Sequence, residues 1–253
     1  MKIAMTKVIG TLIAIPAFMV SSVASYPPEE PAAVVTMVDG KATVTTCGAK
    51  TGTALKKNDK LAKNQEVQVG ERSRIELRYP DGTVMRFAER SRIKLEDISY
   101  DSKTQYKKVK VDLGGGKLWA NVKKLLTADS KVEVKTVNAV AGVRGTVYRV
   151  TVEEDNSAVI KVYDGSVYVS GLPQEVPKPA AQVSGPVPVP GPHEVPPPYH
   201  PVTREEWTVI VQSMQQISIS PQGVASQPQD FSPQQDQDEW VKWNQDRDKE
   251  LEL

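Results

Sequence analysis

The sequence is poor in the residues that most often bind metals or attack substrates. Its 253 residues include one cysteine and two histidines. The single Cys47 excludes an intrachain disulfide, and both histidines, His193 and His200, lie in a proline-rich stretch. The chain also lacks the HExxH, GxSxG and P-loop motifs. We therefore predict that the protein is not an enzyme and holds neither a metal nor a cofactor.

Long apolar runs are also scarce, and the one that stands out lies at the N terminus. Two lysines open the sequence, the run VIGTLIAIPAFMV follows, and the small residues Ser22 and Ala24 come next. This order is typical of a secretory signal peptide, so we predict that residues 1–24 are removed and that the chain is periplasmic or otherwise exported. The run is shorter than the roughly 20 residues that span a bilayer, so we expect no transmembrane helix after cleavage. An uncleaved signal anchor is the alternative.

The net charge of +1 hides an uneven distribution of charges. Residues 41–149 contain 24 Lys and Arg against 12 Asp and Glu, whereas residues 203–253 contain 4 against 10. A basic body with an acidic C-terminal part indicates either a polyanionic partner or a tail that folds back onto the body. Solvated strand faces are the plainer interpretation. Nucleic acid is a poor candidate partner for an exported protein, whereas anionic cell-wall polymers are accessible to it.

Alternation of apolar and polar residues dominates residues 33–170. The alternating stretches are rich in Val, Ile, Thr and Tyr, and Asp-Gly or Gly-Gly pairs separate them, as in β-hairpins. We therefore predict one all-β domain over residues 33–170, built either as a β-sandwich or as a short solenoid-like stack. Burial of its many aliphatic side chains, at roughly 1.5–3 kcal/mol each, can stabilise such a domain without disulfides.

The period of two also assigns side chains to the two faces of each strand. We expect Ile75 and Leu77 to point into the core. The adjacent acids Glu96 and Asp97 should point to opposite faces of their strand, which makes them a poor catalytic pair. The residues around Ile75 and Leu77 that we expect to point into solvent are Arg74, Glu76 and Arg78.

The composition changes after Ser170. Residues 171–202 hold most of the 19 prolines, and we predict an extended linker there because proline cannot donate to a β-ladder.

Residues 203–220 begin with a capping-box arrangement and continue with apolar residues at helical spacing, which predicts a short amphipathic helix. For residues 221–253 we predict a disordered acidic tail that could end in a helix. The apolar face of the predicted 203–220 helix is our candidate partner-binding surface and consists of Trp207, Ile210, Val211, Met214 and Ile217.

Three segments, in order along the chain, resemble the FecR domain. VQVGERSRIELRYPDGTVMRFAERSRIKLED is similar to its earlier half, VKVDLGGGKLWANV to its middle, and AVAGVRGTVYRVTV with SAVIKVYDGSVYVS to its end. The best-known FecR proteins are anti-sigma regulators whose periplasmic domain senses an outer-membrane receptor. This chain has a predicted signal peptide where those proteins have a cytoplasmic anti-sigma segment. It therefore resembles the stand-alone exported FecR-domain proteins.

The resemblance draws attention to an Arg-Gly-Thr element near the end of the domain. Gly142 and Gly145 would permit close approach or positive φ, and Thr146 would begin the next strand. Arg144 would either bond buried carbonyls or face outward as a contact. We interpret the element as structural rather than catalytic. The full structural signature is Gly142, Arg144, Gly145, Thr146, Asp164 and Gly165.

These observations predict an exported, non-enzymatic FecR-domain protein. We expect it to act as a binding, signalling or scaffold module that contacts another envelope protein. The alternative is a binder of cell-envelope polysaccharide or peptidoglycan that uses a basic face of the β-sheet.

Overall fold

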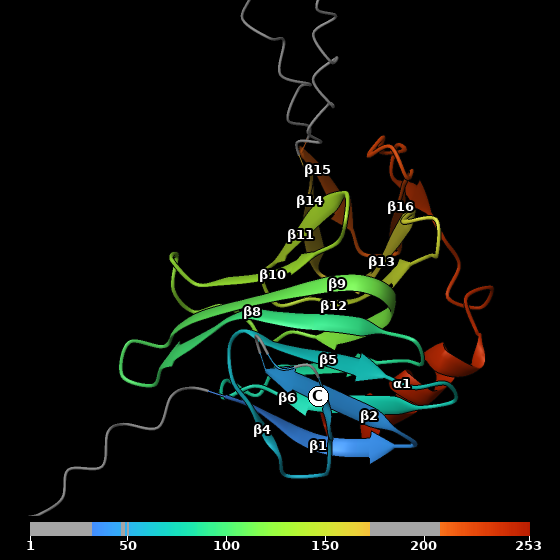
Figure 1. Ribbon diagram of the computed structural model, residues 1–253. Helices are drawn as coiled ribbons and strands as arrows, with labels where there is room; N and C mark the ends of the chain where they lie inside the picture. Colours follow the sequence, from blue (N-terminus) through green and yellow to red (C-terminus); the bar gives the residue numbers. More distant parts are fainter. Residues whose placement is uncertain (1–31, 47–48, 50, 173–207) are drawn as a thin grey trace, which may run out of the picture.

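The computed structural model describes residues 32–46, 49, 51–172 and 208–253. The predicted signal peptide, Cys47, residues 173–202 of the predicted linker, and Trp207 lie outside these ranges. The described residues form seventeen β-strands and one α-helix, arranged as two β-layers with the helix against one of them (Figure 1). We call the layers sheet A and sheet B.

Sheet A carries the helix. Its strand order is β4-β1-β6-β7-β9-β12-β13-β16-β17, and neighbouring strands are antiparallel. The strands are β1 (Ala33–Asp39), β4 (Lys60–Leu61), β6 (Arg74–Arg78), β7 (Val84–Phe87), the end of β9 (Tyr106–Asn121), β12 (Val147–Val152), β13 (Ala158–Asp164), β16 (Gln215–Ile219) and β17 (Gln229–Asp230).

Sheet B is the second layer. Its strand order is β3-β2-β5-β8-β9-β10-β11-β14-β15, and only the β9–β10 pair is parallel among the described strands. The strands are β2 (Ala42–Thr46), β3 (Thr53–Ala54), β5 (Gln65–Val69), β8 (Arg92–Asp101), the start of β9, β10 (Lys131–Lys135), β11 (Ala139–Val143), β14 (Ser166–Gly171) and β15 (Thr208–Gln212).

Strand β9 joins the two layers and runs across the middle of the molecule (Figure 1). Up to Gly115 it pairs with β8 or β10 in sheet B, and from Gly116 it pairs with β7 or β12 in sheet A. Gly116 has a φ of +89°, and a Cβ at this position would lie 2.6 Å from Ser91 Cα. The crossing therefore requires glycine at position 116.

One hydrophobic core fills the space between the layers, with side chains from both sheets. Ile75 and Leu77 are fully buried in it, as predicted from the alternation of their strand. The all-β class is confirmed. Two layers enclose one core, and the chain passes repeatedly from one layer to the other.

Two predictions of side-chain orientation were wrong. Glu76 was expected in solvent, but it is 1% exposed, because the C-terminal part of the chain covers the outer face of sheet A. Glu96 and Asp97 were expected on opposite faces, but a register shift between Leu95 and Asp97 lets both carboxylates reach lysines on the outer face of sheet B. A bulge of this kind breaks the period of two.

The predicted helix over residues 203–220 is also wrong in the part that the structure describes. Residues 208–219 form two strands joined by a tight turn, β15 in sheet B and β16 in sheet A, with Met214 in the turn at a φ of +63°. Val211, Ile217 and Ile219 point into the core, because the edges of β14 and β13 are available for pairing. The segment is rich in β-branched residues, which favour strands, and the apolar spacing fitted both a helix and two short strands.

The predicted disorder of residues 221–253 is likewise corrected. The segment continues through β17 into helix α1 (Glu239–Glu250), so the helix that we expected at the end of the tail is present. Asp238 caps the helix, since its side chain accepts a hydrogen bond from the backbone N–H of Val241. Among the described residues, no helix is long and apolar enough to cross a membrane.

Candidate functional site

The outer face of sheet A carries one row of polar and aromatic side chains, one from each of five neighbouring strands. Strand register places Glu76, Arg86, Trp119, Arg149 and Lys161 directly beside one another in this order. We call these five residues the polar row. Four of the five are charged, yet Glu76, Arg86 and Arg149 are buried. Something must therefore compensate their charges.

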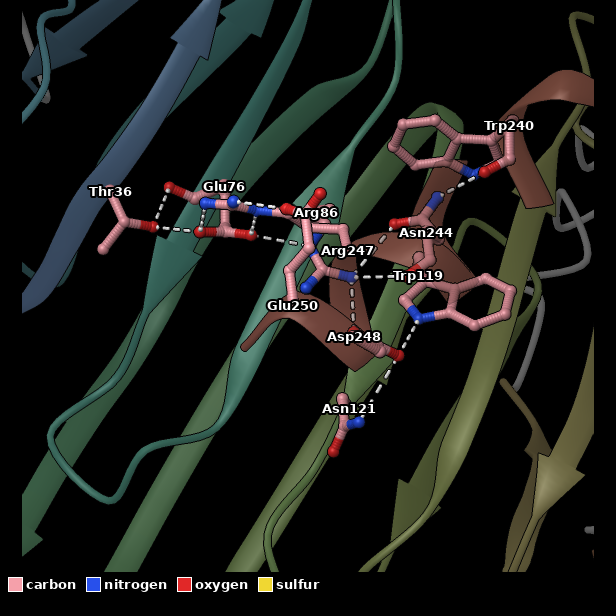
Figure 2. Close-up of polar contacts among 10 residues, drawn as sticks. All are labelled: Thr36, Glu76, Arg86, Trp119, Asn121, Trp240, Asn244, Arg247, Asp248 and Glu250. Carbon is pink, nitrogen blue, oxygen red and sulfur yellow. Dashed lines mark hydrogen bonds and ion pairs between the residues drawn. The ribbon is translucent and has the colours of Figure 1, made fainter. Parts of the chain in front are cut away.

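Residues 229–253, here named the C-terminal segment, lie across the polar row and supply that compensation. Figure 2 shows the half of the contact that involves helix α1. Asp248 accepts hydrogen bonds from Arg86 Nη1 at 2.6 Å, Trp119 Nε1 at 3.0 Å and Asn121 Nδ2 at 3.4 Å. Asn244 adds its backbone and side-chain oxygens, each 3.3 Å from Arg86 Nη1. One carboxylate is thus held by three donors from sheet A.

A second carboxylate is held in the same way at the other end of the row. Asp236 accepts hydrogen bonds from Arg149 Nη2 at 2.5 Å, Lys161 Nζ at 3.0 Å and the Tyr163 hydroxyl at 2.5 Å. Burial, with the bond to Asp236, raises the pKa of Tyr163, so its hydroxyl stays protonated and remains a donor. Asp238 also pairs with Arg149, at 3.1 Å. We call the two sets of donors around Asp236 and Asp248 the carboxylate cradles.

Glu76 is the single acid of the polar row, and it receives a basic residue from the C-terminal segment. Its carboxylate accepts hydrogen bonds from Arg86 Nε at 2.7 Å, Thr36 Oγ1 at 2.7 Å and Arg247 Nε at 3.3 Å (Figure 2). Burial, the largest single influence, would raise the pKa of Glu76, but these three donors together outweigh it and lower the pKa below 4.5. The carboxylate therefore stays ionised in the folded protein.

A pH dependence of stability follows from the lowered pKa of Glu76. A group whose pKa is lower in the folded state adds stability above its unfolded-state pKa, and that stability disappears as the pH falls through the folded value. We expect the free energy of unfolding of the wild-type chain to fall as the pH drops below about 4.5. Chemical denaturation across this range should show a smaller fall for Glu76→Gln. Parallel curves for the two chains would contradict the assignment.

The apolar part of the contact is small by comparison. Val241 is fully buried against Trp119 and Tyr163, whose ring centroids are 4.7 Å apart. Phe231 meets Tyr163 edge-on, with 5.4 Å between centroids. The C-terminal segment is therefore held by ion pairs and hydrogen bonds together with a smaller aromatic cluster, in which Trp240 packs on the same residues and the Trp243 ring centroid lies 4.4 Å from Arg74 Cζ.

One feature of the sequence pointed to this contact. The charge difference between residues 41–149 and residues 203–253 allowed a tail that folds back onto the body, and the structure confirms that alternative. Trp240 and Trp243 in the same segment stack with 5.4 Å between their ring centroids. The members of the polar row themselves were missed, because outward-facing charges on a strand normally contact water.

The Arg-Gly-Thr element lies at the junction of β11 and β12. Gly145 has a φ of +79°, and a Cβ there would be 2.9 Å from Lys124 Cα. Thr146 is buried and donates from Oγ1 to the Ser166 carbonyl at 2.9 Å. Arg144 is exposed, with Nη2 3.5 Å from the Thr127 carbonyl. These contacts fit a structural role for Gly145 and Thr146.

The remaining signature glycines differ in what they permit. Gly165 follows Asp164 in the turn between β13 and β14, with a φ of +85°. Gly142 lies opposite Tyr168 in the β11–β14 ladder, and the nearest atom to a Cβ there would be the Tyr168 carbonyl oxygen at 3.9 Å. The positive φ of the turn explains why residue 165 is glycine. At position 142 a Cβ would meet no close contact, and its absence leaves open space beside Tyr168.

The structure divides the predicted partner-binding residues into two groups. Val211 and Ile217 are fully buried in the core, so they cannot contact a partner. Ile210 is 46% exposed and Met214 is 39% exposed. Trp207 lies outside the described residues. The surface that remains accessible is Ile210 on β15 and Met214 in the turn that follows.

The lysines on the outer face of sheet B alternate with carboxylates. This pairing leaves less uncompensated positive charge for a polyanion than the sequence count suggested, and such exposed pairs add little stability. The pairs are Lys108–Asp97 at 2.7 Å, Lys110–Glu133 at 2.9 Å, Lys135–Asp112 at 3.6 Å and Lys135–Glu96 at 3.8 Å.

An open groove of about 750 Å³ lies beside the turns that precede β6, β8 and β13, and Asp238, Glu239 and Trp240 at the start of α1 also line it. Arg72, Arg90 and Arg92 line one part of it, and Glu153 and Glu154 line another. Its charges are of both signs. Among the described residues, no group of three His, Cys, Asp or Glu side chains is placed to hold a metal ion.

Comparison with known proteins gives one family-model match and one similarity to solved structures. Residues 65–168 match the family model described as "FecR protein", which confirms the resemblance predicted from the sequence. The fold is similar to two crystal structures of a candidate anti-sigma factor from Parabacteroides distasonis ATCC 8503, at 1.65 Å and 2.50 Å resolution. Each has 17% identity, a TM-score of 0.44, and an alignment that covers 67% of this chain and 61% of the other, so the chain spans about three fifths of that protein. No protein with a curated description matches in sequence.

Proposed function

Because residues 65–168 are a FecR domain, we propose that the protein is an exported binding or signalling module that contacts another envelope protein and catalyses no reaction. Export is proposed from the signal-peptide pattern of residues 1–24. The observation that carries the proposal is the edge of strand β15. Within the described residues β15 pairs only with β14, so its other edge is free to pair with a strand from a partner.

The two edge strands of sheet B differ in how well they are protected against pairing with other chains. At one end the edge strand is β3, which has two residues and is followed by the exposed lysines Lys56 and Lys57. Very short edge strands and lysines discourage pairing with other chains. At the other end β15 has the five-residue sequence TVIVQ, with no charge and no proline. The β15 edge therefore lacks the features that usually protect an edge.

Exposed apolar side chains accompany this edge. Ile210 lies directly opposite Tyr168 in the β14–β15 ladder, and the two are 46% and 45% exposed. The missing side chain at Gly142, the next residue across the sheet, leaves the Tyr168 ring uncovered on that side. An extended partner segment added to β15 would gain main-chain hydrogen bonds from the edge and apolar contact with Ile210.

Crosslinking in intact cells, followed by mass spectrometry, tests this proposal. We expect a protein crosslinked to the wild-type chain to be lost or strongly reduced with Ile210→Lys, since a charge at an edge strand opposes pairing. Leu126→Lys is the matched control, because Leu126 is 70% exposed and lies outside β15. Point variants are preferable to truncation after Ser170, which would remove β15, β16 and α1 together.

Two results would count against contact through β15. A protein partner retained by Ile210→Lys would place the contact elsewhere. Recovery of cell-wall fragments alone, with both variants and with loss at high ionic strength, would indicate the alternative polymer-binding function.

A further inference from the structure

The contact between the C-terminal segment and sheet A differs in kind from the rest of the molecule's packing. The space between the two sheets is filled by aliphatic and aromatic side chains, but the polar row is covered mainly through ionised groups. Only Val241 of the segment is a fully buried apolar residue. A face that presents Arg86, Arg149 and Lys161 would be solvated by water if the segment left. The contact is therefore suited to release and rebinding.

Charge complementarity across the contact is strong. Residues 229–253 contain eight Asp and Glu against three Lys and Arg. The polar row opposes them with three cations and one acid. Asp236, just before the N-cap of α1, and Asp248, in its last turns, each occupy one carboxylate cradle. The face thus recognises an acidic helix by two carboxylates that are twelve residues apart in sequence.

The segment does not satisfy every donor of the face. Arg86 Nη2 and Arg149 Nε are buried and have no hydrogen-bond acceptor among the described residues. Unpaired buried donors of charged groups are costly. The guanidinium in each cradle can donate its unused N–H to a further carboxylate oxygen, so another ligand could satisfy this surface better than the segment of this chain does.

We propose that the outer face of sheet A, centred on the polar row, is a docking surface for an acidic helix, occupied in cis by residues 229–253 and open to the same kind of helix supplied by another molecule. The partner is defined by its chemistry: a short helix with one carboxylate just before its N terminus and another near its C terminus. The tethered segment acts as an intramolecular competitor at high effective concentration, so binding from outside is suppressed until the segment is weakened or displaced. This surface is separate from the β15 edge, so the two proposals can fail independently.

A labelled synthetic peptide with the sequence of residues 229–253 tests the proposal by fluorescence anisotropy with the full chain. In the double variant Asp236→Asn with Asp248→Asn, the chain's own C-terminal segment is held more weakly. We expect this chain to bind the wild-type peptide at least about tenfold more tightly than the wild-type chain does. A peptide with both aspartates replaced by asparagine should bind the double-variant chain at least about tenfold more weakly than the wild-type peptide does. Neutral amides form weaker hydrogen bonds with the carboxylate cradles. Adding Lys161→Glu to the double-variant chain should abolish its binding of the wild-type peptide. Circular dichroism checks that each chain keeps its β-structure.

Hydrogen exchange of the α1 amides in the double variant makes every outcome decisive. Fast exchange in α1, with protected amides in β9 and β12 and tight binding of the peptide, supports the proposal. Fast exchange in α1 without peptide binding would overturn it, as would equal binding of the aspartate and asparagine peptides. Protection of α1 equal to that of β9 would show that the two carboxylates do not hold the segment, and this result would overturn it as well.

Discussion

Replacing Arg86 with methionine should lower the free energy of unfolding by about 3–5 kcal/mol, the usual loss when one partner of a buried ion pair is removed. Arg86 is fully buried and Glu76 is 1% exposed, with 2.7 Å between Arg86 Nε and the Glu76 carboxylate. The variant leaves the charge of Glu76 buried with only Thr36 and Arg247 as donors, and it removes the closest contact of Asp248. Urea denaturation measures the change.

The double variant Glu76→Leu with Arg86→Met is the matched control. It removes both charges, so no buried ion is left uncompensated, and we expect it to be more stable than Arg86→Met alone. A loss of less than about 1 kcal/mol for Arg86→Met would contradict the prediction. It would show that the pair is hydrated in solution and that the C-terminal segment does not exclude water from the polar row.

Replacing Gly116 with alanine should be similarly damaging, for a reason of backbone geometry. The φ of +89° at Gly116 is unfavourable for any residue with a Cβ, which costs about 1–3 kcal/mol. The added Cβ would also lie 2.6 Å from Ser91 Cα and 2.8 Å from Ser91 N, where backbone would have to move. We expect a loss of about 3 kcal/mol or more in the free energy of unfolding, because β9 pairs with strands of both sheets on either side of this residue.

Gly114 provides the comparison for this prediction. It lies two residues earlier in the same strand, and the nearest atom to a Cβ there would be Arg92 Cβ at 3.9 Å, an ordinary contact. Gly114→Ala should therefore change the free energy of unfolding by less than about 1 kcal/mol. Equal losses for the two alanine variants would show that the crossing of β9 between the sheets does not depend on the conformation of Gly116.

The docking of the C-terminal segment connects stability with recognition. Glu76, Arg86 and Asp248 contribute both to the stability of sheet A and to the hold on α1 (Figure 2). Loss of the segment would therefore lower stability, and a competing acidic helix would restore it by mass action. A rise in thermal stability on addition of the residue 229–253 peptide to the chain with Asp236→Asn and Asp248→Asn is the corresponding expectation.

Strands β15 and β16 show why one element was predicted in the wrong form. Residues 207–217 carry apolar side chains at positions that satisfy a helical period and also two short strands. Local sequence could not choose between them. The choice depended on β14 and β13, whose edges give main-chain hydrogen bonds to β15 and β16.

The sequence by itself determined the all-β class, the FecR resemblance and the inward positions of residues such as Ile75 and Leu77. These follow from a period of two, which is a local property of the chain. Tertiary structure alone decided that Glu76 is buried, that α1 docks on sheet A, and that β15 pairs only with β14 among the described residues. Whether an outward-facing charge contacts water depends on which other part of the chain packs over it. Glu76 is covered in part by Arg247, which lies 171 residues further along the chain. Contacts at such separation follow from the packing of the folded chain and leave no periodic pattern in its sequence.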